Sequence, residues 1–343
     1  MVFTTPIIRA VRQRFPGAQL SYLVEAAGAP VVGANPLISD VITTPHSRGW
    51  RRLRDDLTLA RTLRARRFDL VIDLHGGPRS AWLTWASGAA RRVGYDVPGR
   101  SWMYTQRVGR PKTYRARHAV ENQWDLLRVV DAAFDRRPSP ETDRVEMPVD
   151  PRVAAAIPRT LTDLGVPPGA RPVVLHVSAG NPFRRWPEAS FARIAAELVS
   201  SSTDRWVMVT AGPSDRQAAH RIIVAARARA TAAASRIVDA ESLSLADLRA
   251  VLDHASLFIG GDSGPMHIAA TSDVPVVTIY GPTRPERSAP WRPSSIPSLA
   301  VEPGDLPCRP CDQRVCVPGD FRCLSQVSPE AVLAAAMRVM ESR

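Results

Sequence analysis

A short polar segment between two apolar runs holds the residues best suited to bind an anion. Asp262, Ser263 and Gly264 follow an aliphatic run, and His267 comes three residues later. Glycine lets the backbone approach a ligand closely, serine offers a hydroxyl, and an imidazole can donate a hydrogen bond to a phosphate oxygen. This combination favours a phosphate site. The alternative is an ordinary turn in which Asp262 caps a helix and His267 is packed or solvated.

A second segment contributes positive charge. Ser178 begins a loop of small residues that leads to Arg184 and Arg185, whose planar guanidinium groups suit the paired oxygens of a diphosphate. Gly212 and Asp215 follow the next apolar run, from where they could contact the ribose of a nucleotide. These residues fit a nucleotide diphosphate.

Parallel strands would bring these segments together. Apolar runs at 172–177, 205–210 and 257–261, and a fourth that ends at Tyr280, alternate with segments of helical length. This alternation is the pattern of β-α-β units in a parallel sheet. Such sheets bind ligands beyond the carboxyl ends of their strands, beside the starts of the helices. The polar residues follow the strands and therefore fall where a parallel sheet binds ligands.

The first half of the chain repeats this arrangement. Asp73, His75 and Arg79 follow the predicted strand 68–74, and the guanidinium of Arg79 could hold a carboxylate or a phosphate. Asp73 is a candidate general base. A carboxylate at a strand end also commonly accepts backbone N–H groups, and this structural role is the alternative.

Longer strings resemble one known family. The string Asp262–Ala270, followed by Pro275–Val277 and Gly281–Thr283, resembles the nucleotide-sugar signature of the bacterial heptosyltransferases, which are glycosyltransferases. The segments 4–10, 71–76, 79–80 and 184–187 resemble the same family, so the resemblance covers nearly the whole chain. It implies an α/β fold of two Rossmann-like domains facing a cleft, the GT-B fold. It also implies transfer of heptose from ADP-heptose to the inner core of lipopolysaccharide, with inversion.

The resemblance also implies which residues bind each substrate. The expected donor-binding residues are Asp262, Ser263, Gly264, His267, Arg184, Ser178, Gly212 and Leu243, and the expected acceptor-binding residues are Thr5, His75 and Arg79. Leu243 stands where the family packs the nucleotide base, and Arg184 stands where a lysine is usual. No cofactor is implied. No DxD-like acidic pair stands where a metal would hold the diphosphate, so we expect a metal-independent reaction.

The domain boundaries are expected at 1–148, 149–171 as a linker, 172–326, and 327–343 as a final helix. Residues 1–15 read as a helix, whereas a doubly wound domain normally begins with a strand. In the family, a strand and a Gly-Asp pair come before the segment that matches Met1–Pro6, and that aspartate is the proposed base. We therefore expect the first strand and the base to be absent, through a late assigned start or a true truncation, and the first domain to be marginal.

The composition is that of a soluble globular protein with an anionic partner. The chain has 343 residues, 23% of them charged, and a formal net charge of +12. No apolar run is long enough to span a bilayer, and the first residues do not form a signal peptide. We expect a cytoplasmic protein, and peripheral contact at the inner face of the inner membrane is compatible with this expectation. Nucleic acid is the weaker candidate partner, because no nucleic-acid-binding motif accompanies the charge.

One predicted helix combines apolar and basic residues. Trp50, Leu53, Leu57 and Ala60 lie at helical spacing, and the surrounding arginines are Arg48, Arg51, Arg52, Arg54, Arg61, Arg64, Arg66 and Arg67. This pattern indicates contact with anionic headgroups or a phosphorylated acceptor. The alternative is a helix whose charges simply face water.

The four cysteines lie close together in the sequence. They are Cys308, Cys311, Cys316 and Cys323. Four thiolates can form a closed structural zinc site, and the alternative is a loop packed by reduced thiols. The sequence thus leaves three functions open: a heptosyltransferase, an inactive protein that binds a nucleotide sugar or an anionic glycan, and, more weakly, a nucleic-acid-binding protein.

Overall fold

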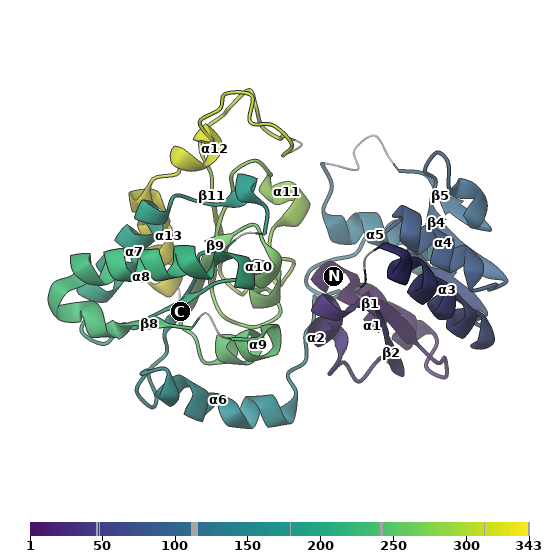
Figure 1. Cartoon of the computed structure of the whole chain (residues 1–343), viewed down its shortest axis with the longest axis horizontal. Coiled ribbons are helices and arrows are strands. Elements are labelled where there is room, and N and C mark those ends of the chain that lie inside the picture. The colour runs from purple at the N-terminus through teal and green to yellow at the C-terminus, as the bar shows by residue number, and fades with distance from the viewer. Residues whose placement is uncertain are drawn as a thin grey trace. The chain divides into compact units, whose positions relative to one another are not determined.

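The structure is a computed structural model that describes residues 1–45, 47, 49–110, 116–178, 180–240, 243–311 and 313–341. The chain divides into two compact units, built on Phe3–Glu146 and on Met147–Arg343. Helices alternate with parallel strands in both units, so the predicted α/β class is confirmed (Figure 1). The division falls two residues before the predicted end of the first domain.

The second unit holds a six-stranded parallel sheet. Its strands are β6 (Val173–His176), β7 (Val207–Thr210), β8 (Ile237–Asp239), β9 (Leu257–Gly261), β10 (Val276–Ile279) and β11 (Ser298–Val301). They are ordered β11-β10-β9-β6-β7-β8. This is the Rossmann order, in which the direction of winding reverses between β6 and β9. The reversal opens a crevice beyond the carboxyl ends of these two strands.

Helices cover both faces of this sheet (Figure 1). One face carries α7 (Glu188–Ser200), α8 (Arg216–Ala230) and α13 (Pro329–Glu341), and the other carries α9 (Leu245–Asp253) and α10 (Gly264–Ala269). Leu175 and Ile259 are completely buried beneath the first set. Because both faces are covered, the central strands are apolar at nearly every position. Two further helices are short, α11 (Pro285–Ser288) and α12 (Arg322–Ser325).

The segments expected as a linker and as a final helix both pack on the second unit. The expected linker contains α6 (Pro151–Asp163), whose buried Ile157 and Leu161 lie four residues apart on one face. This helix packs against α9 and so belongs to the second unit. The final helix α13 likewise adds Val332 and Ala336 to the core of that unit. Amphipathic faces that find a partner in the second unit explain both positions.

The first unit begins with a helix, as predicted. Its helices are α1 (Thr5–Arg14), α2 (Ala29–Val32), α3 (Gly49–Ala65), α4 (Pro78–Ala86) and α5 (Ala119–Arg128). Its strands are β1 (Ser21–Glu25), β2 (Asp40–Thr44), β3 (Leu70–Ile72), β4 (Arg91–Tyr95) and β5 (Gln106–Val108). Apolar residues of α1 and α5, including Ile7 and Trp124, pack against β4.

The strands of this unit form two sheets instead of one. β1 pairs with β2, and β3, β4 and β5 form a separate parallel sheet. Within the residues that the structure describes, β1 and β3 share no ladder. One parallel strand between them would complete the Rossmann order found in the second unit. Leu23 and Ile72 are only half-buried here, whereas the residues of β6 and β9 are fully buried. The described residues of this unit therefore form two separate sheets, and neither contains a strand that joins β1 to β3.

Candidate functional site

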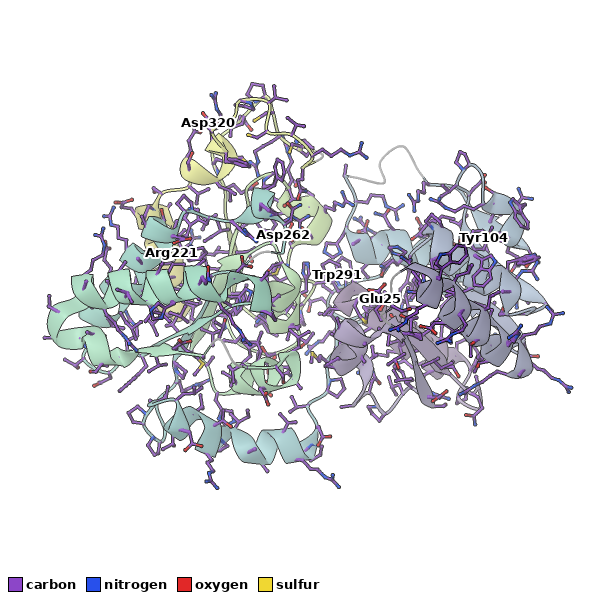
Figure 2. All side chains as sticks on the ribbon, viewed as in Figure 1. Glu25, Tyr104, Arg221, Asp262, Trp291 and Asp320 are labelled. Atoms are coloured by element: carbon purple, nitrogen blue, oxygen red, sulfur yellow. The ribbon has the colours of Figure 1, made fainter. Side chains whose placement is uncertain are left out.

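The turns after β9 and β10 are joined through a buried carboxylate. Asp262 directly follows β9, and its side chain is 3% exposed (Figure 2). Its Oδ2 accepts a hydrogen bond of 2.6 Å from Oγ1 of Thr283, which follows β10. A Cβ at Gly261 would lie 3.4 Å from the carbonyl oxygen of Arg184, at the lower limit of ordinary van der Waals contact. The loop after β6 therefore lies directly against the end of β9.

Arg184 brings positive charge to this turn. It ends the 3-10 turn Pro182–Arg184 in the loop after β6, and its Nη1 donates to the carbonyl oxygen of Asp262 at 3.0 Å. The same nitrogen lies 3.2 Å from Asp262 Oδ2. Among the described residues, Nη2 makes no hydrogen bond, and the side chain is 30% exposed. The loops after β6 and β9 therefore meet at the reversal point, and one arm of a fixed guanidinium remains available to an anion.

The predicted helix start is short but offers two buried oxygens. α10 has six residues, so its dipole is weaker than a full-length helix would supply. Ser263 precedes it without capping it, and its Oγ is buried with no hydrogen-bond partner in the described part of the chain. Oδ1 of Asp262 is also buried without a hydrogen-bond partner among the described residues, and Nε2 of His267 lies 3.7 Å from it. Buried polar atoms of this kind normally have partners, and a ligand would supply them.

Ser178 and Gly212 form a supporting layer beside this turn. Ser178 Oγ donates to Oδ2 of the buried Asp215 at 2.5 Å, and Nη2 of Arg185 lies 2.8 Å from its Oδ1. A Cβ on Gly212 would come within 3.1 Å of Ser178 Oγ. Both oxygens of Asp215 are therefore engaged by the protein itself. This geometry does not support the predicted contact of Asp215 with a ribose.

A buried imidazole lies under the same loops. His176 ends β6, and its Nδ1 is 3.0 Å from Oγ1 of Thr210. Burial lowers the pKa of His176 to about 4, although the nearby carboxylate of Asp215 acts in the opposite direction. The ring is neutral in the folded protein at physiological pH. Its role is structural, because it is 5% exposed.

Leu243 lies at the far end of the same edge of the sheet. It follows β8, just before α9, and is half-buried. The order β9-β6-β7-β8 places it three strands from Asp262, which is about 14 Å at the usual spacing of strands. A ligand that contacts both residues would have to be extended along the carboxyl ends of the strands.

The loop that carries the cysteines contacts the turns that follow β6 and β10. Oε1 of Gln313 accepts hydrogen bonds of 2.8 Å from Arg184 Nε and from Asn181 Nδ2. Arg309 donates to the carbonyl oxygen of Thr283 at 2.9 Å. No sequence pattern predicted the contacts of Gln313 and Arg309, because their partners are remote in the chain. Only the cysteine spacing had drawn attention to this loop.

The cysteines themselves are free, half-buried thiols. Burial raises the pKa of Cys323, and the neighbouring thiols of Cys308, Cys311 and Cys316 add to the effect. No group of three or more His, Cys, Asp or Glu side chains within the described ranges is arranged to hold a metal ion. The geometry therefore gives no support to the zinc alternative and fits a loop packed by reduced thiols.

In the first unit, Asp73 is held by three hydrogen bonds. Its Oδ1 accepts from the backbone N–H groups of His75 at 3.0 Å and Gly76 at 2.9 Å, and its Oδ2 accepts from Oη of Tyr104 at 2.6 Å. Burial and this bond raise the pKa of Tyr104, which Figure 2 labels. Asp73 is 5% exposed. These contacts fit the structural interpretation and leave the carboxylate poorly placed to act as a base.

The three predicted acceptor residues lie in different environments. His75 is exposed at the end of β3. Arg79 is partly buried, and its Nε and Nη2 donate to Oδ1 of Asp56 at 3.0 and 2.5 Å. Thr5 is completely buried, and its Oγ1 accepts a hydrogen bond from the backbone N–H of Glu146. Thr5 is therefore inaccessible, and the prediction that it contacts an acceptor finds no support in this geometry.

One exposed carboxylate at this edge was missed by the sequence analysis. Glu25 ends β1, its side chain is 74% exposed, and its Oε1 lies 4.0 Å from Nη1 of Arg79 (Figure 2). Nothing around Glu25 in the sequence marks it, because its proximity to Arg79 depends on the packing of β1 beside α4.

Comparisons with known proteins agree with one another. The profile of the family described as “Glycosyltransferase family 9 (heptosyltransferase)” matches residues 57–319. Lipopolysaccharide heptosyltransferase 3 of Escherichia coli K12 is 27% identical over 346 residues, which cover 99% of this chain and 94% of that protein. A family 9 glycosyl transferase from Veillonella parvula has a similar fold, with a TM-score of 0.84 at 20% identity, over 100% and 94% of the two chains. The E. coli heptosyltransferase WaaC, solved with ADP-2-deoxy-2-fluoro heptose, gives 0.69 at 21% identity, over 98% and 95%.

Proposed function

This chain belongs to glycosyltransferase family 9, the heptosyltransferase family, and we propose that it transfers a heptose or a similar sugar from ADP-heptose to the lipopolysaccharide inner core. The two Rossmann-like units and the similarity to solved heptosyltransferases identify the fold as GT-B. The donor is proposed because WaaC was solved with an ADP-heptose analogue. The acceptor is proposed from the name of the E. coli relative.

The observation that carries the proposal is the meeting of two loops at the reversal point of the second sheet. Arg184 offers an arm with no hydrogen bond among the described residues, and Ser263 offers a buried hydroxyl without a partner. Both groups can donate to the oxygens of a diphosphate. Asp262 would repel a phosphate, so its unpaired Oδ1 suits a sugar hydroxyl, which donates a hydrogen bond. Its negative charge also fixes Arg184 in place.

The proposed reaction is a single displacement. The acceptor hydroxyl oxygen attacks the anomeric carbon, the bond from that carbon to the diphosphate oxygen breaks, ADP leaves, and the configuration inverts. Donors to the leaving diphosphate stabilise the charge that develops in the transition state. Arg184 and His267 supply this stabilisation in our proposal, and we expect no metal requirement, because the donor set here contains cations instead of paired carboxylates.

The reaction also needs a group that takes the acceptor proton. Asp73 is engaged by Tyr104 and two backbone amides, whereas Glu25 is exposed at the end of β1 and lies 4.0 Å from Arg79. A carboxylate within reach of the acceptor hydroxyl is a suitable general base. We therefore assign this role to Glu25. Arg79 would then orient both Glu25 and an anionic group of the acceptor.

A second function is a nucleotide-sugar or anionic-glycan binding protein that does not catalyse transfer. The engaged state of Asp73 and the split sheet of the first unit favour it, because both remove features that catalysis would use. The proposed donor-binding residues of the second unit, at Arg184, Asp262 and Ser263, would be unaffected. The two functions thus differ in transfer and not in donor binding.

The test is to supply purified protein with ADP-heptose and a deacylated, phosphorylated core oligosaccharide. ADP release together with a product heavier by one heptose supports the transferase, and the rate should be unchanged by EDTA. Donor binding by calorimetry without product supports the binding protein. Absence of both donor binding and product contradicts both functions. Because the proposed acceptor is a membrane glycolipid, we also propose that the protein works at the inner face of the inner membrane.

A further inference from the structure

The first half of α3 (Gly49–Ala65) presents apolar side chains that are exposed in the described part of the chain. Trp50 is 87% exposed, Leu53 53% and Leu57 43%. Their spacing of three and four residues puts them on one face of the helix. Scattered exposed apolar residues are normal, but three on one helical face form a continuous stripe.

A different face of α3 packs into the protein. Leu59 and Leu63 are buried against Leu83 of α4 and against the half-buried Trp82. Leu59 comes nine residues after Trp50, about two and a half turns at 3.6 residues per turn, so the two side chains point in nearly opposite directions. The three exposed side chains therefore do not help to pack α3 against the rest of its unit.

Positive charge surrounds the exposed stripe. α3 carries five arginines and two aspartates, which leaves three positive charges, and Arg66 and Arg67 follow directly. Arg51 and Arg61 have no ion-pair partner in the described part of the chain, while Arg52 lies only 3.9 Å from an Asp56 that Arg79 already binds. Arg54 is 80% exposed, at 4.0 Å from Asp55. Arg48, which the sequence placed in the same patch, lies outside the described residues.

We propose that this face of α3 docks the protein on an anionic phospholipid bilayer. Trp50, Leu53 and Leu57 would enter the interfacial region, and Arg51, Arg54 and Arg61 would contact the phosphates of the headgroups. Tryptophan and a basic polar face are the features of helices that lie in the membrane interface. No helix within the described ranges is long and apolar enough to cross a bilayer, so α3 would lie on the membrane. α3 lies at the surface of its unit (Figure 1).

A protein partner would fit this face of α3 less well than a lipid surface would. A protein interface would be expected to pair the arginines with carboxylates in fixed positions, whereas Arg51 and Arg61 have no ion-pair partner among the described residues. An anionic lipid surface needs no such register, because its headgroups are mobile and dense. The inference deepens the proposed function, which needs access to a membrane glycolipid. Its test uses no sugar donor or acceptor, so the two can fail separately.

The experiment is co-sedimentation of the purified full-length chain with vesicles that contain no lipopolysaccharide. Vesicles of equimolar phosphatidylglycerol and phosphatidylcholine should bind the protein, and vesicles of phosphatidylcholine alone should bind it much less. Raised salt should weaken binding, because headgroup contacts are screened. The double variant Trp50→Ala/Leu53→Ala should lose binding by roughly tenfold or more, and each of Arg51→Ser and Arg54→Ser by roughly fivefold.

Matched controls separate this face from exposed apolar residues in general. Trp102→Ala removes another exposed tryptophan, 61% accessible and in edge-to-face contact with Trp85, and Val224→Ser removes an exposed valine of α8. Both should bind vesicles as the unaltered chain does. Equal losses in the controls would overturn the assignment to α3. It would also be overturned if anionic vesicles bound no protein, or bound it only after lipopolysaccharide was added, since the latter would make α3 an acceptor-binding element.

Discussion

Gln313 holds Arg184 from 129 residues further along the chain, through a hydrogen bond of 2.8 Å between its Oε1 and the Arg184 Nε. The same oxygen accepts from Asn181, so one amide fixes both the arginine and the loop that carries it. The proposed donor site thus depends on a residue of the cysteine loop. Gln313 contacts Nε and leaves Nη2 without a hydrogen bond from the described residues, which makes Gln313 a positioning residue.

We expect Gln313→Ala to weaken donor use without removing charge from the site. Loss of a hydrogen bond to a charged group costs about 1.5 kcal/mol, or about a tenfold rise in KM for ADP-heptose. kcat should change less, because Arg184 remains present. Steady-state kinetics with varied donor measure both constants. Gln326→Ala, at an exposed glutamine beyond α12, is the control, and a loss of the same size there would show a general effect on the loop.

Removing the guanidinium itself should have a larger effect. Arg184→Ala is expected to lower kcat/KM by roughly a hundredfold, because the leaving diphosphate loses a fixed cationic donor. Arg221→Ala removes an exposed arginine of α8 that pairs with Glu188 (Figure 2), and its kinetics should equal those of the unaltered chain. Unchanged transfer in Arg184→Ala would remove this residue from the proposed site.

Amide substitution of the two carboxylates of the first unit should lower kcat to very different extents. Glu25→Gln should lower kcat by roughly a hundredfold or more with little change in donor affinity, because it removes the proposed base. Asp73→Asn keeps an oxygen for the amides of His75 and Gly76, so its kcat should fall only a few-fold. Single-turnover transfer measures both. The reverse ranking would make Asp73 the base and leave Glu25 as a surface residue.

The lowered pKa of His176 predicts an acid-sensitive second unit. Its pKa is about 4 when folded against an ordinary value of 6.5, so between these pH values the unfolded chain binds a proton that the folded chain does not. Stability is therefore fully present above about pH 6.5 and falls by up to about 3 kcal/mol towards pH 4. Urea unfolding at several pH values measures it. The slope should be smaller in His176→Gln and unchanged in His254→Gln, where the imidazole is exposed.

The split sheet predicts unequal local stability. Among the described residues, β1 and β3 each pair with one strand, whereas β6 and β9 each pair with two. Amide hydrogens of β1 and β3 should therefore exchange with solvent faster than those of β6 and β9, by a factor of at least about ten. Hydrogen exchange read by mass spectrometry checks this. Equal protection of all four strands would show that the first unit is not marginal.

The sequence by itself determined the features that depend on neighbours in the chain. Alternating apolar runs and helical segments defined the parallel sheets, and the string from Asp262 to His267 marked the turn after β9. The helix α1 was also predictable, because its apolar residues recur at helical spacing. These inferences needed only periodicity and local composition.

Only the tertiary structure decided which side chains are free to act. Thr5 proved to be buried, Asp73 was engaged by Tyr104, and Arg79 was bound to Asp56. The helix α6 belongs to the second unit because it packs against α9 and buries Ile157. Gln313 and Glu25 entered the proposed site without any local signal. In each case the deciding partner is brought close by folding, and no spacing in the sequence specifies a contact between residues so far apart in the chain.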